Sequence, residues 1–437
     1  MKYFIWTEGC QMNVVDSQHT ASALEKIGYD RSQKAEDADV IVLNTCVVRQ
    51  SAEDKAYGRL QSLKPLKNTN PDLVINVMGC LIGFKGDKEF QEKYSYVDVF
   101  SPPSDPRPLI NHLIGREANK INQSLAENQN SILDEDFSLP IHLRNNLVST
   151  YISIVLGCSH ACSYCVIPYR RGAEESRPPE LIIKEAESLV EQGIKEITLL
   201  GQIVDRYGVD KPDYPSLAKL LKMIHEIDEL ERIRFLTSHP NYMTDELLNT
   251  VAELPKVMPH IEVPIQSGDD IVLGNMRRGY TVKKYIDLIE KIRAIVPGVS
   301  IGTDIIVGFP GESEHQFNNT YNLLKDLKLD VAHLARYSPR PNTLSTRTMP
   351  DDVPEPEKWD RFRALEELQK GIVEKINQQY LRNCVDVLFE VKNKNRWRGR
   401  TPTNRLVFVE NDLDLRGKLL PVKIKWAGPW SLIGDLK

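Results

Sequence analysis

The nine residues Gly157-Cys-Ser-His-Ala-Cys-Ser-Tyr-Cys165 carry the signal that decides the fold. They place three thiols, those of Cys158, Cys162 and Cys165, on one short loop. The loop directly follows residues 151–156, an apolar run typical of a β-strand. Reactive side chains of α/β barrels lie on the loops that follow the carboxyl ends of strands. The stretch therefore predicts a thiolate-bound metal centre at the end of the first barrel strand.

Three thiolates can bind three irons of a [4Fe–4S] cluster and leave the fourth iron open to a substrate. S-adenosylmethionine (SAM) can chelate that iron through its amino and carboxylate groups, and an electron from the cluster then cleaves the sulfonium. The alternative is a closed zinc site, which needs four ligands. His160 is the nearest candidate for the fourth, but its position inside the loop makes simultaneous chelation awkward. We interpret the loop as the cluster site of a radical SAM enzyme.

The chain around this loop alternates strand and helix signals. Six units suggest a partial (β/α)6 barrel, short of the eight units of a closed one. The strands are predicted at 151–156, 196–200, 232–236, 261–265, 299–307 and 331–337, and the helices at 179–192, 216–227, 245–254, 282–295, 314–327 and 357–379. Polar side chains at or near strand ends are candidates for contact with SAM, and these are Gly201, Gln202, Ser238, Gln266 and Asp304. Loop solvation is the alternative for each.

A second set of cysteines lies in the first 118 residues. Strand signals at 3–7, 40–44 and 74–78, with helices between them, predict an α/β domain with a parallel sheet. Cys10, Cys46 and Cys80 each lie just beyond one of these strands. Parallel strands bring their carboxyl ends to one edge of the sheet, so the three thiols are expected to converge there. Gly9 and Gly79 suit tight turns or close backbone approach beside them. The alternative is three unrelated buried cysteines.

After residue 380 the pattern changes to five short strands without helices, at 385–391, 396–400, 406–409, 419–426 and 431–436. This favours a small all-β barrel of a kind that often binds oligonucleotides. Residues 381–437 hold 12 Lys and Arg against 6 Asp and Glu, in a chain of net charge −5. A basic tail on an acidic body is a reason to consider nucleic acid.

Four residues of the tail suit RNA in particular, through phosphate contact and base stacking: Arg396, Trp397, Arg398 and Arg400. The alternative is an exposed basic strand. Trp426 and Trp430 are predicted in the barrel core. Arg170 and Arg171 could meet RNA phosphate, but a solvated surface pair is the default interpretation.

The chain has 437 residues and seven cysteines, no apolar run of the roughly 18 residues expected of a membrane span, and no signal-peptide pattern at its start. We therefore expect a cytoplasmic protein without membrane contact, in which reduced thiols serve metals or catalysis. Cys384 fits neither set and is predicted as a packed strand cysteine. The polar stretch 119–146 is predicted as a linker. The expected division is 1–118, 144–375 and 376–437.

These residues resemble the radical SAM tRNA methylthiotransferases of the MiaB type over nearly the whole chain. Carrying the resemblance are GCQMN (9–13), NTCVVR (44–49), GC (79–80), GCSHACSYCVIPYRRGAEESRP (157–178), TSHP (237–240), QSG (266–268), MRRGYT (276–281), IVGFPGE (306–312) and YSPRP (337–341). The tail Gly399-Arg-Thr401 with Asn404 resembles the RNA-binding barrel called the TRAM domain.

The resemblance implies that Cys158, Cys162 and Cys165 hold the SAM-cleaving cluster, and that Cys10, Cys46 and Cys80 hold an auxiliary [4Fe–4S] cluster that carries or supplies sulfur. One SAM would methylate that sulfur. A second would yield a 5′-deoxyadenosyl radical, which removes hydrogen from C2 of an N6-isopentenyladenosine beside the tRNA anticodon, before transfer of the methylthio group. Expected partners are the anticodon stem-loop and a reduced flavodoxin or ferredoxin-type electron donor, and we expect a monomer.

The chain departs from the family pattern at two places. Gly201-Gln-Ile-Val-Asp205 replaces the usual Gly-Gln-Asn-Val-Asn, so Ile203 removes an amide near the expected SAM or substrate pocket, and Leu81-Ile-Gly83 replaces Met-Ala-Gln. Three rival functions stay open: methylthiolation of a ribosomal-protein aspartate, methylthiolation of threonylcarbamoyl-adenosine in tRNA, and a non-catalytic RNA-binding protein that contains zinc.

Overall fold

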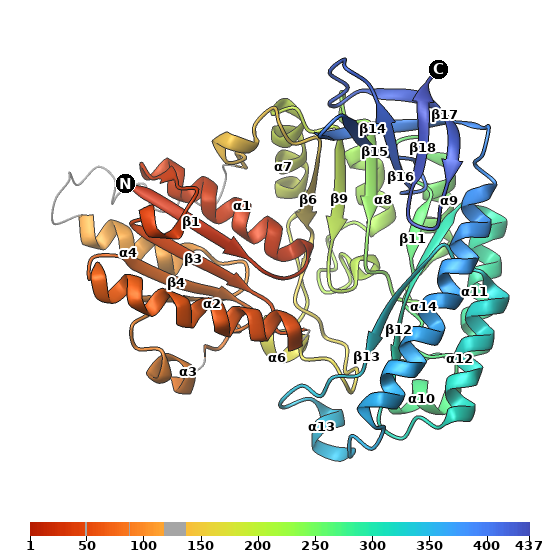
Figure 1. Cartoon of the computed structure of the whole chain (residues 1–437), viewed down its shortest axis with the longest axis horizontal. Helices are drawn as coiled ribbons and strands as arrows, with labels where there is room; N and C mark the ends of the chain where they lie inside the picture. The colour runs from red at the N-terminus through yellow and green to blue at the C-terminus, as the bar shows by residue number, and fades with distance from the viewer. Residues whose placement is uncertain (49, 87, 118–136) are drawn as a thin grey trace. The chain divides into compact units, whose positions relative to one another are not determined.

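A computed structural model describes residues 1–48, 50–86, 88–117 and 137–437 (Figure 1). The chain forms two units. The first comprises residues 1–144, 151–160 and 165–192, and the second comprises 145–150, 161–164 and 193–437. Of the predicted linker, residues 119–136 lie outside the described part, and the remainder contains one short 3-10 helix, η2 (Ile141–Leu143).

The first unit is built on a five-stranded parallel sheet in the order β2-β1-β3-β4-β5. The strands are β1 (Lys2–Thr7), β2 (Asp30–Arg31), β3 (Val40–Thr45), β4 (Val74–Gly79) and β5 (Val99–Ser101). The three predicted strands are confirmed. The two edge strands were not predicted, because two or three residues are too few to show a periodic pattern.

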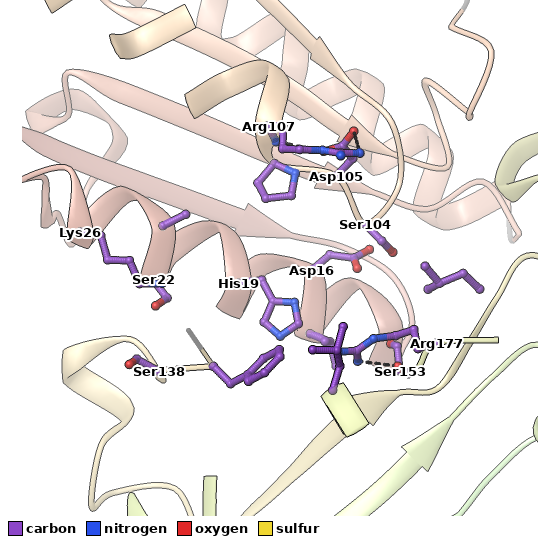
Figure 2. A pocket seen from close by; sticks show the side chains of 16 residues that line it. Asp16, His19, Ser22, Lys26, Ser104, Asp105, Arg107, Ser138, Ser153 and Arg177 are labelled. Atoms are coloured by element: carbon purple, nitrogen blue, oxygen red, sulfur yellow. Dashed lines mark hydrogen bonds and ion pairs between the residues drawn. The ribbon is translucent and has the colours of Figure 1, made fainter. Parts of the chain in front are cut away.

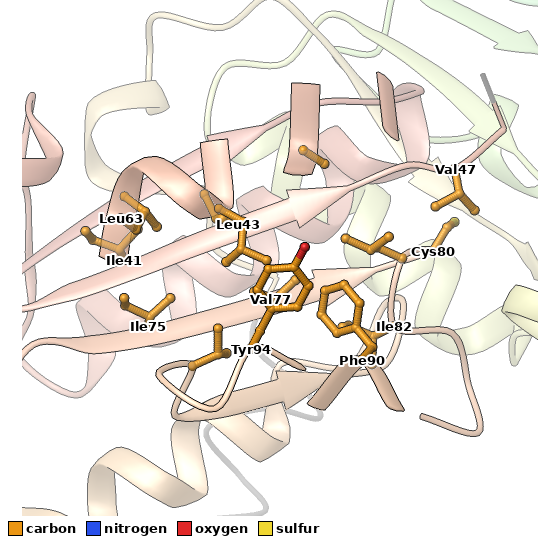
Figure 3. Packing of buried hydrophobic residues seen from close by; sticks show 14 of the residues in the cluster. Ile41, Leu43, Val47, Leu63, Ile75, Val77, Cys80, Ile82, Phe90 and Tyr94 are labelled. Carbon is orange, nitrogen blue, oxygen red and sulfur yellow. The ribbon is translucent and has the colours of Figure 1, made fainter. Parts of the chain in front are cut away.

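Both faces of this sheet are apolar, as expected of parallel strands covered on both sides. Successive side chains of a strand point to opposite faces. Ile41 and Leu43 therefore pack with Leu63 of α2 on one face (Figure 3). Val40 and Val42 pack on the opposite face, in the cluster that includes residues of α1 and α4. This double covering fixes the register of β3 and aligns the strand ends that carry the cysteines.

Helices and short elements complete the first unit. They are α1 (Gln11–Lys26), η1 (Ala35–Asp37), α2 (Gln50–Thr69), α3 (Lys88–Lys93), α4 (Arg107–Glu117), β7 (Val155–Leu156), α6 (Ile167–Arg171), β8 (Glu175–Ser176) and α7 (Pro179–Glu191). The antiparallel pair β7 and β8 brings the start of the tight cysteine loop beside the chain that follows α6.

The second unit contains the strands and helices expected of the partial barrel. The strands form two sheets, in the orders β10-β9-β6 and β11-β12-β13. They are β6 (Ser149–Ser153), which begins in this unit, β9 (Glu196–Leu200), β10 (Arg232–Phe235), β11 (His260–Glu262), β12 (Ser300–Val307) and β13 (Val331–Arg336). An isolated bridge joins Ile233 of β10 to Val257, which precedes β11. The six predicted strands are present, but β11 ends three residues early.

Its helices are η3 (Val204–Arg206), α8 (Leu217–His225), α9 (Asp245–Glu253), α10 (Asp270–Asn275), α11 (Val282–Ile295), α12 (Glu314–Leu327), α13 (Leu344–Thr348) and α14 (Glu355–Gln378). Four of them begin at a Ser or Thr whose hydroxyl accepts a backbone N–H: Ser216, Thr244, Thr281 and Ser313. Such caps satisfy donors that a helix start leaves open. In the described residues no helix has the length and apolar character needed to cross a membrane.

The chain ends in a closed barrel with the strand order β14-β15-β16-β18-β17. The strands are β14 (Cys384–Asn393), β15 (Arg396–Arg400), β16 (Leu406–Glu410), β17 (Leu419–Ala427) and β18 (Leu432–Leu436). The expected small all-β barrel is confirmed. The chain as a whole is an α/β protein with an N-terminal parallel sheet, a central α/β core and a terminal β-barrel.

Three predictions about single residues of this barrel are wrong. Trp426 and Trp430 are 50% and 64% exposed, and Cys384 is exposed at the first residue of β14. A register shift between Ile424 and Trp426 interrupts the pairing of β17 with β18. Such a bulge reverses the inward and outward alternation, so Ile424 is buried and Trp426 is not. Trp430 lies in the turn that connects β17 to β18, outside the barrel core.

Two arginines of β10 connect the α/β core of the second unit with the terminal barrel. Arg232 donates through Nη1 to the carbonyl of Arg400 at 2.6 Å. Arg234 donates to the carbonyls of Thr401 and Pro402 and forms an ion pair with Glu196 at 3.0 Å. Both arginines are buried. Their guanidinium groups donate to backbone carbonyls in and just after β15, which joins the barrel to β10.

Replacing Arg234 with methionine is therefore expected to destabilise the second unit by about 3–5 kcal/mol, because it leaves the Glu196 carboxylate buried and unpaired. Denaturant unfolding measures the loss. Lys283→Met is the control, because its ion pair with Asp287 is exposed and contributes at most about 1 kcal/mol. Equal stability of the two variants would contradict the buried contact.

Candidate functional site

Cys10, Cys46 and Cys80 lie at one edge of the sheet, just after β1, β3 and β4. Cys46 and Cys80 are buried, and their thiols are close enough to shift each other's pKa. Cys10 is exposed and close enough to both to interact with them electrostatically. The structure thus brings together three thiols that are 36 and 34 residues apart in sequence. Within the described ranges, no three His, Cys, Asp or Glu side chains already form the ligand set of a metal ion.

Two glycines allow this convergence. A Cβ atom on Gly9 would lie 2.8 Å from the Cβ of Cys46 and 2.2 Å from Oδ1 of Asn13. Gly79 has φ of +97°, and a Cβ there would lie 2.4 Å from the carbonyl oxygen of Thr45. Only glycine tolerates this φ together with such close approach. The expected role of both glycines is confirmed.

A pair of buried amides fixes the turn that carries Cys10. Oδ1 of Asn13 accepts the backbone N–H of Cys10 at 3.1 Å, while Nδ2 of Asn13 donates to Oδ1 of Asn44 at 2.8 Å. Asn44 donates back to the Asn13 carbonyl at 2.8 Å. The two side chains therefore hold the start of α1 against the end of β3. They occur in the motifs GCQMN and NTCVVR, which is the signal by which the sequence could have identified them.

The prediction that Arg171 belongs to a solvated surface pair is wrong. Arg171 is 9% exposed rather than solvated. Its Nε donates to Sγ of Cys80 at 3.3 Å, its Nη1 donates to Oγ of Ser104 at 3.2 Å, and its Nη2 forms an ion pair with Asp16 at 3.4 Å. Arg170, its neighbour on α6, donates to the carbonyl of Leu81 at 3.3 Å. Both arginines are therefore engaged in contacts within the protein, unlike the solvated pair that was predicted.

The electrostatics of the three thiols are uneven. The pKa of Cys80 is lowered to about 6, chiefly because Cys46 donates a hydrogen bond to it and also because Arg171 is adjacent, while burial acts in the opposite direction. The same hydrogen bond and burial raise the pKa of Cys46. Cys10 is exposed as a residue, but neighbouring protein atoms desolvate its thiol and raise its pKa. The positive charge of Arg171 beside Cys80 favours the thiolate, which is the form of cysteine that binds iron.

The tight triad lies on the loop after β7. The division between the two units passes through this loop, so each part is described with its own neighbours. In the first unit the backbone N–H of Cys158 donates to the carbonyl of Gly172 at 3.0 Å, and the N–H of His160 donates to Sγ of Cys158 at 3.4 Å. Cys165 immediately precedes the residue that caps α6.

In the second unit Cys162 contacts a buried arginine. Nη1 of Arg278 donates to Sγ of Cys162 at 3.2 Å, and its Nε donates to the hydroxyl of Tyr280 at 2.8 Å. That hydroxyl in turn donates to the carbonyl of Ile265 at 2.9 Å. These contacts tie Cys162 to the segment that follows β11. Arg278 belongs to the motif MRRGYT but was not proposed as a site residue.

The five predicted SAM contacts lie in the second unit and form two groups. The hydroxyl of Thr237 donates to the carbonyl of Gly201 at 2.5 Å, which brings Ser238 close to Gly201 and Gln202. The N–H of Gln266 donates to the carbonyl of Asp304 at 2.8 Å, so these two residues lie on neighbouring segments of the backbone. Asp304 lies within β12 rather than beyond its end.

Several features near Ser238 fit a polar ligand. Its hydroxyl is buried and has no hydrogen-bond partner in the part of the chain that the structure describes. Asp205 accepts the N–H of His239 at 3.0 Å, and desolvation raises the pKa of Asp205 to about 7.

Ile203 is buried, so its departure from the family pattern places an apolar side chain in the packed interior.

The predicted RNA-binding strand is β15, and its alternation separates the four residues. Arg396, Arg398 and Arg400 point outward, with side chains 54%, 44% and 36% exposed. Trp397 is 3% exposed, belongs to the barrel core and donates through Nε1 to the carbonyl of Leu413 at 2.9 Å. The prediction that Trp397 stacks on a base is therefore wrong, because period-two alternation turns it inward.

This arrangement predicts different effects for two neighbouring substitutions. Trp397→Ala is expected to destabilise the barrel by about 3–5 kcal/mol, as a large core truncation does. Arg398→Ala is expected to change stability by no more than about 0.5 kcal/mol and to weaken tRNA binding, with a reduced dependence of affinity on salt. Denaturant unfolding and tRNA titrations at several salt concentrations measure the two effects. Reversed effects would contradict the assignment of the faces.

A cavity of ≈ 310 Å³ lies in the first unit beside α1 (Figure 2). Its wall includes Asp16 and Ser104, the two side chains that hold Arg171. The buried hydroxyls of Ser22 and Ser153 also line it, and neither has a hydrogen-bond partner among the residues described. The cavity is therefore lined by polar side chains, including two that contact Arg171.

Three family models match the chain. The Radical SAM superfamily matches residues 152–324, the TRAM domain matches 378–437, and an uncharacterized protein family, UPF0004, matches 2–101. Together they follow the order of the α/β sheet, the radical SAM core and the terminal barrel.

Curated relatives match along the full length. A tRNA-2-methylthio-N(6)-dimethylallyladenosine synthase of Roseiflexus sp. (strain RS-1) is 45% identical over 439 residues, covering 100% of this chain and 89% of the relative. An enzyme of the same name from Dehalococcoides mccartyi (strain CBDB1) is 44% identical over 435 residues, covering 99% of this chain and 98% of the relative.

Solved structures show the same fold at low identity. The radical S-adenosylmethionine methyltransferase TsrM from Kitasatospora setae, with cobalamin and a [4Fe–4S] cluster bound, has a TM-score of 0.58 and 12% identity, covering 91% of this chain and 80% of that one. The cobalamin-dependent radical enzyme OxsB, with aqua-cobalamin and S-adenosylmethionine bound, has a TM-score of 0.52 and 13% identity, covering 86% of this chain and 56% of that one.

Proposed function

The chain belongs to the radical SAM tRNA methylthiotransferases, the family of the tRNA-2-methylthio-N(6)-dimethylallyladenosine synthases, and from that membership we propose how its residues divide the reaction. The enzyme adds a methylthio group to C2 of N6-dimethylallyladenosine in tRNA. The observation that carries this function is the identity of about 45% to such synthases over the whole chain. Membership of the radical SAM superfamily implies a [4Fe–4S] cluster and SAM.

Cys158, Cys162 and Cys165 hold the cluster that acts on SAM. When bound, this cluster and SAM supply radical chemistry strong enough to remove hydrogen from an aromatic C–H bond. Arg278 keeps a positive charge and a hydrogen-bond donor against Cys162. Gly201, Gln202, Ser238, Gln266 and Asp304 bind SAM. The unpartnered hydroxyl of Ser238 supports this role, because a buried hydroxyl is costly unless a ligand satisfies it.

Cys10, Cys46 and Cys80 hold the auxiliary [4Fe–4S] cluster, from which the sulfur is delivered. The donor set fits, because three thiols at one sheet edge leave room for a fourth, non-protein ligand. The lowered pKa of Cys80 favours the thiolate that iron requires. A second cluster explains why a single chain needs two cysteine triads for one reaction.

The terminal barrel binds the anticodon stem-loop. Arg396, Arg398 and Arg400 contact RNA phosphates from the outward face of β15, where their present partners are the exposed carboxylate of Glu410 and the carboxylate of Glu390. Phosphate contacts of this kind position an RNA without reading its sequence. The division of labour follows residues 1–118, 144–375 and 376–437, for sulfur delivery, radical formation and RNA binding.

A reduced flavodoxin or ferredoxin-type protein supplies electrons, and the enzyme works as a monomer in the cytoplasm, where it meets tRNA. Anaerobic assays with each purified donor, and the mass in solution with and without tRNA, test these statements. An enzyme that is active only as a dimer would contradict the second.

Mass spectrometry of tRNA nucleosides tests the function. In a deletion strain we expect loss of 2-methylthio-N6-dimethylallyladenosine and accumulation of N6-dimethylallyladenosine, both reversed by the wild-type gene. Loss of a methylthio group from threonylcarbamoyl-adenosine or from a ribosomal-protein aspartate, with normal dimethylallyladenosine products, would overturn the proposal. Iron and acid-labile sulfide analysis of anaerobically purified enzyme addresses the zinc alternative. Two clusters require about eight irons per chain, and zinc without sulfide would exclude them.

A further inference from the structure

Arg171 makes three contacts that together place it between a thiol and a carboxylate. Its Nε donates to Sγ of Cys80 at 3.3 Å, and its Nη2 meets Oδ2 of Asp16 at 3.4 Å. Its Nη1 donates to Oγ of Ser104 at 3.2 Å. The side chains of Arg171 and Asp16 are each 2% exposed. The guanidinium is therefore held from the side opposite to the cysteines and directed at Cys80.

A buried guanidinium stays charged, because its pKa is too high for it to lose its proton inside a protein. A buried charge must also be paired, and Asp16 is the partner here. The pair is neutral overall, but its positive end faces the sulfur. Replacing Arg171 therefore makes the charge next to Cys80 more negative, and replacing Asp16 makes it more positive.

Hydrogen bonds to the sulfurs and the net charge around them help to set the reduction potential of an iron–sulfur cluster. A donor that stabilises the reduced, more negative state raises that potential. We propose that Arg171 is a positioning residue that sets the reduction potential of the auxiliary centre through Cys80, with Asp16 and Ser104 holding it in place. This inference rests on the proposed auxiliary cluster at Cys10, Cys46 and Cys80.

Because Arg171 and Asp16 carry opposite charges, replacing one or the other is expected to shift the reduction potential in opposite directions. In Arg171→Met the donor and the positive charge are lost, so the potential is expected to become more negative. In Asp16→Asn the arginine stays while its counter-charge is removed, so the potential is expected to become more positive. Each shift should change the ratio of reduced to oxidised cluster at a fixed potential about tenfold, which corresponds to about 59 mV for a one-electron couple.

The measurement uses the full chain in which Cys158, Cys162 and Cys165 are all alanine, so that only the auxiliary cluster titrates. Iron and sulfide analysis comes first, followed by redox titration monitored by electron paramagnetic resonance. Arg171→Met leaves Asp16 buried and unpaired, which could prevent folding. The double variant D16N/R171M avoids that charge, and its potential is expected below that of Asp16→Asn alone. Arg177→Met is the matched control, because it removes another arginine paired with a buried carboxylate, Glu185, at 2.7 Å.

The outcomes are separable. Absence of about four irons from the chain with the three alanines would contradict the proposed auxiliary cluster itself. Four irons with equal potentials in all variants would overturn the role of Arg171 and leave the cluster assignment intact. Loss of iron from the double variant as well would assign Arg171 a purely structural role and so overturn the inference. Opposite shifts for Asp16→Asn and Arg171→Met, with none for Arg177→Met, support it.

Discussion

Replacing Cys162 with alanine is expected to abolish reductive cleavage of SAM and, with it, all methylthio transfer. The substitution removes one of three thiolates that bind the radical-generating cluster, and two thiolates hold a cluster poorly. Iron content should fall from about eight to about four per chain, because the auxiliary triad is unaffected. Product analysis for 5′-deoxyadenosine after reduction with dithionite measures the first effect, and chemical iron analysis measures the second.

The matched control for this variant is Cys384→Ala. Cys384 is an exposed thiol at the start of β14, belongs to neither triad and should retain full iron content and activity after substitution. If the Cys162→Ala protein still cleaved SAM at the wild-type rate, this would contradict the assignment of Cys158, Cys162 and Cys165 to the SAM-cleaving cluster. Loss of all eight irons from Cys162→Ala would instead mean that the two centres assemble together.

Cys10→Ala should separate the two halves of the reaction. SAM cleavage to 5′-deoxyadenosine should persist, because Cys158, Cys162 and Cys165 are intact, whereas methylthio insertion into tRNA should fall to background. Cys10 is the exposed member of the auxiliary triad, while Cys46 and Cys80 are buried. Truncating it therefore removes a ligand at little cost to packing, and a loss of function cannot be attributed to a collapsed core.

Parallel assays of 5′-deoxyadenosine and of modified nucleosides, with the same enzyme and tRNA, measure this separation. Cys384→Ala again serves as the control, with both products expected at wild-type levels. A Cys10→Ala enzyme that methylthiolates tRNA normally would refute the auxiliary assignment. An enzyme that has lost SAM cleavage as well would show that the N-terminal triad is needed for radical formation.

Much of the site is local in sequence and was predicted for that reason. The order Cys158, Cys162, Cys165 after a strand needs no tertiary information. The convergence of Cys10, Cys46 and Cys80 follows from a general rule of parallel sheets and was therefore also predictable. The inward direction of Trp397 follows from the alternation Arg-Trp-Arg-Gly-Arg at 396–400, because successive side chains of a strand point to opposite faces.

Other features depend on breaks in regular patterns. The exposed position of Trp426 depends on a bulge between β17 and β18, and no turn residue marks that bulge in the sequence. β11 ends at Glu262, although the apolar run continues to Ile265, because the segment beyond it pairs irregularly, with a single bridge from Gln266 to Ile305. Such interruptions depend on pairing with a neighbouring strand, which a periodic pattern within one strand does not encode.

The sequence alone determined which cysteines belong together, because strand periodicity and short spacing are local properties. Only the tertiary structure decided which of two adjacent arginines, Arg170 or Arg171, contacts a cysteine. Neighbouring residues of a helix point in different directions, so one of the pair can be buried while the other is not. The partners that bury Arg171 lie 91 and 155 residues away in Cys80 and Asp16, and contacts at that separation exist only once the sheet edge and α6 have come together.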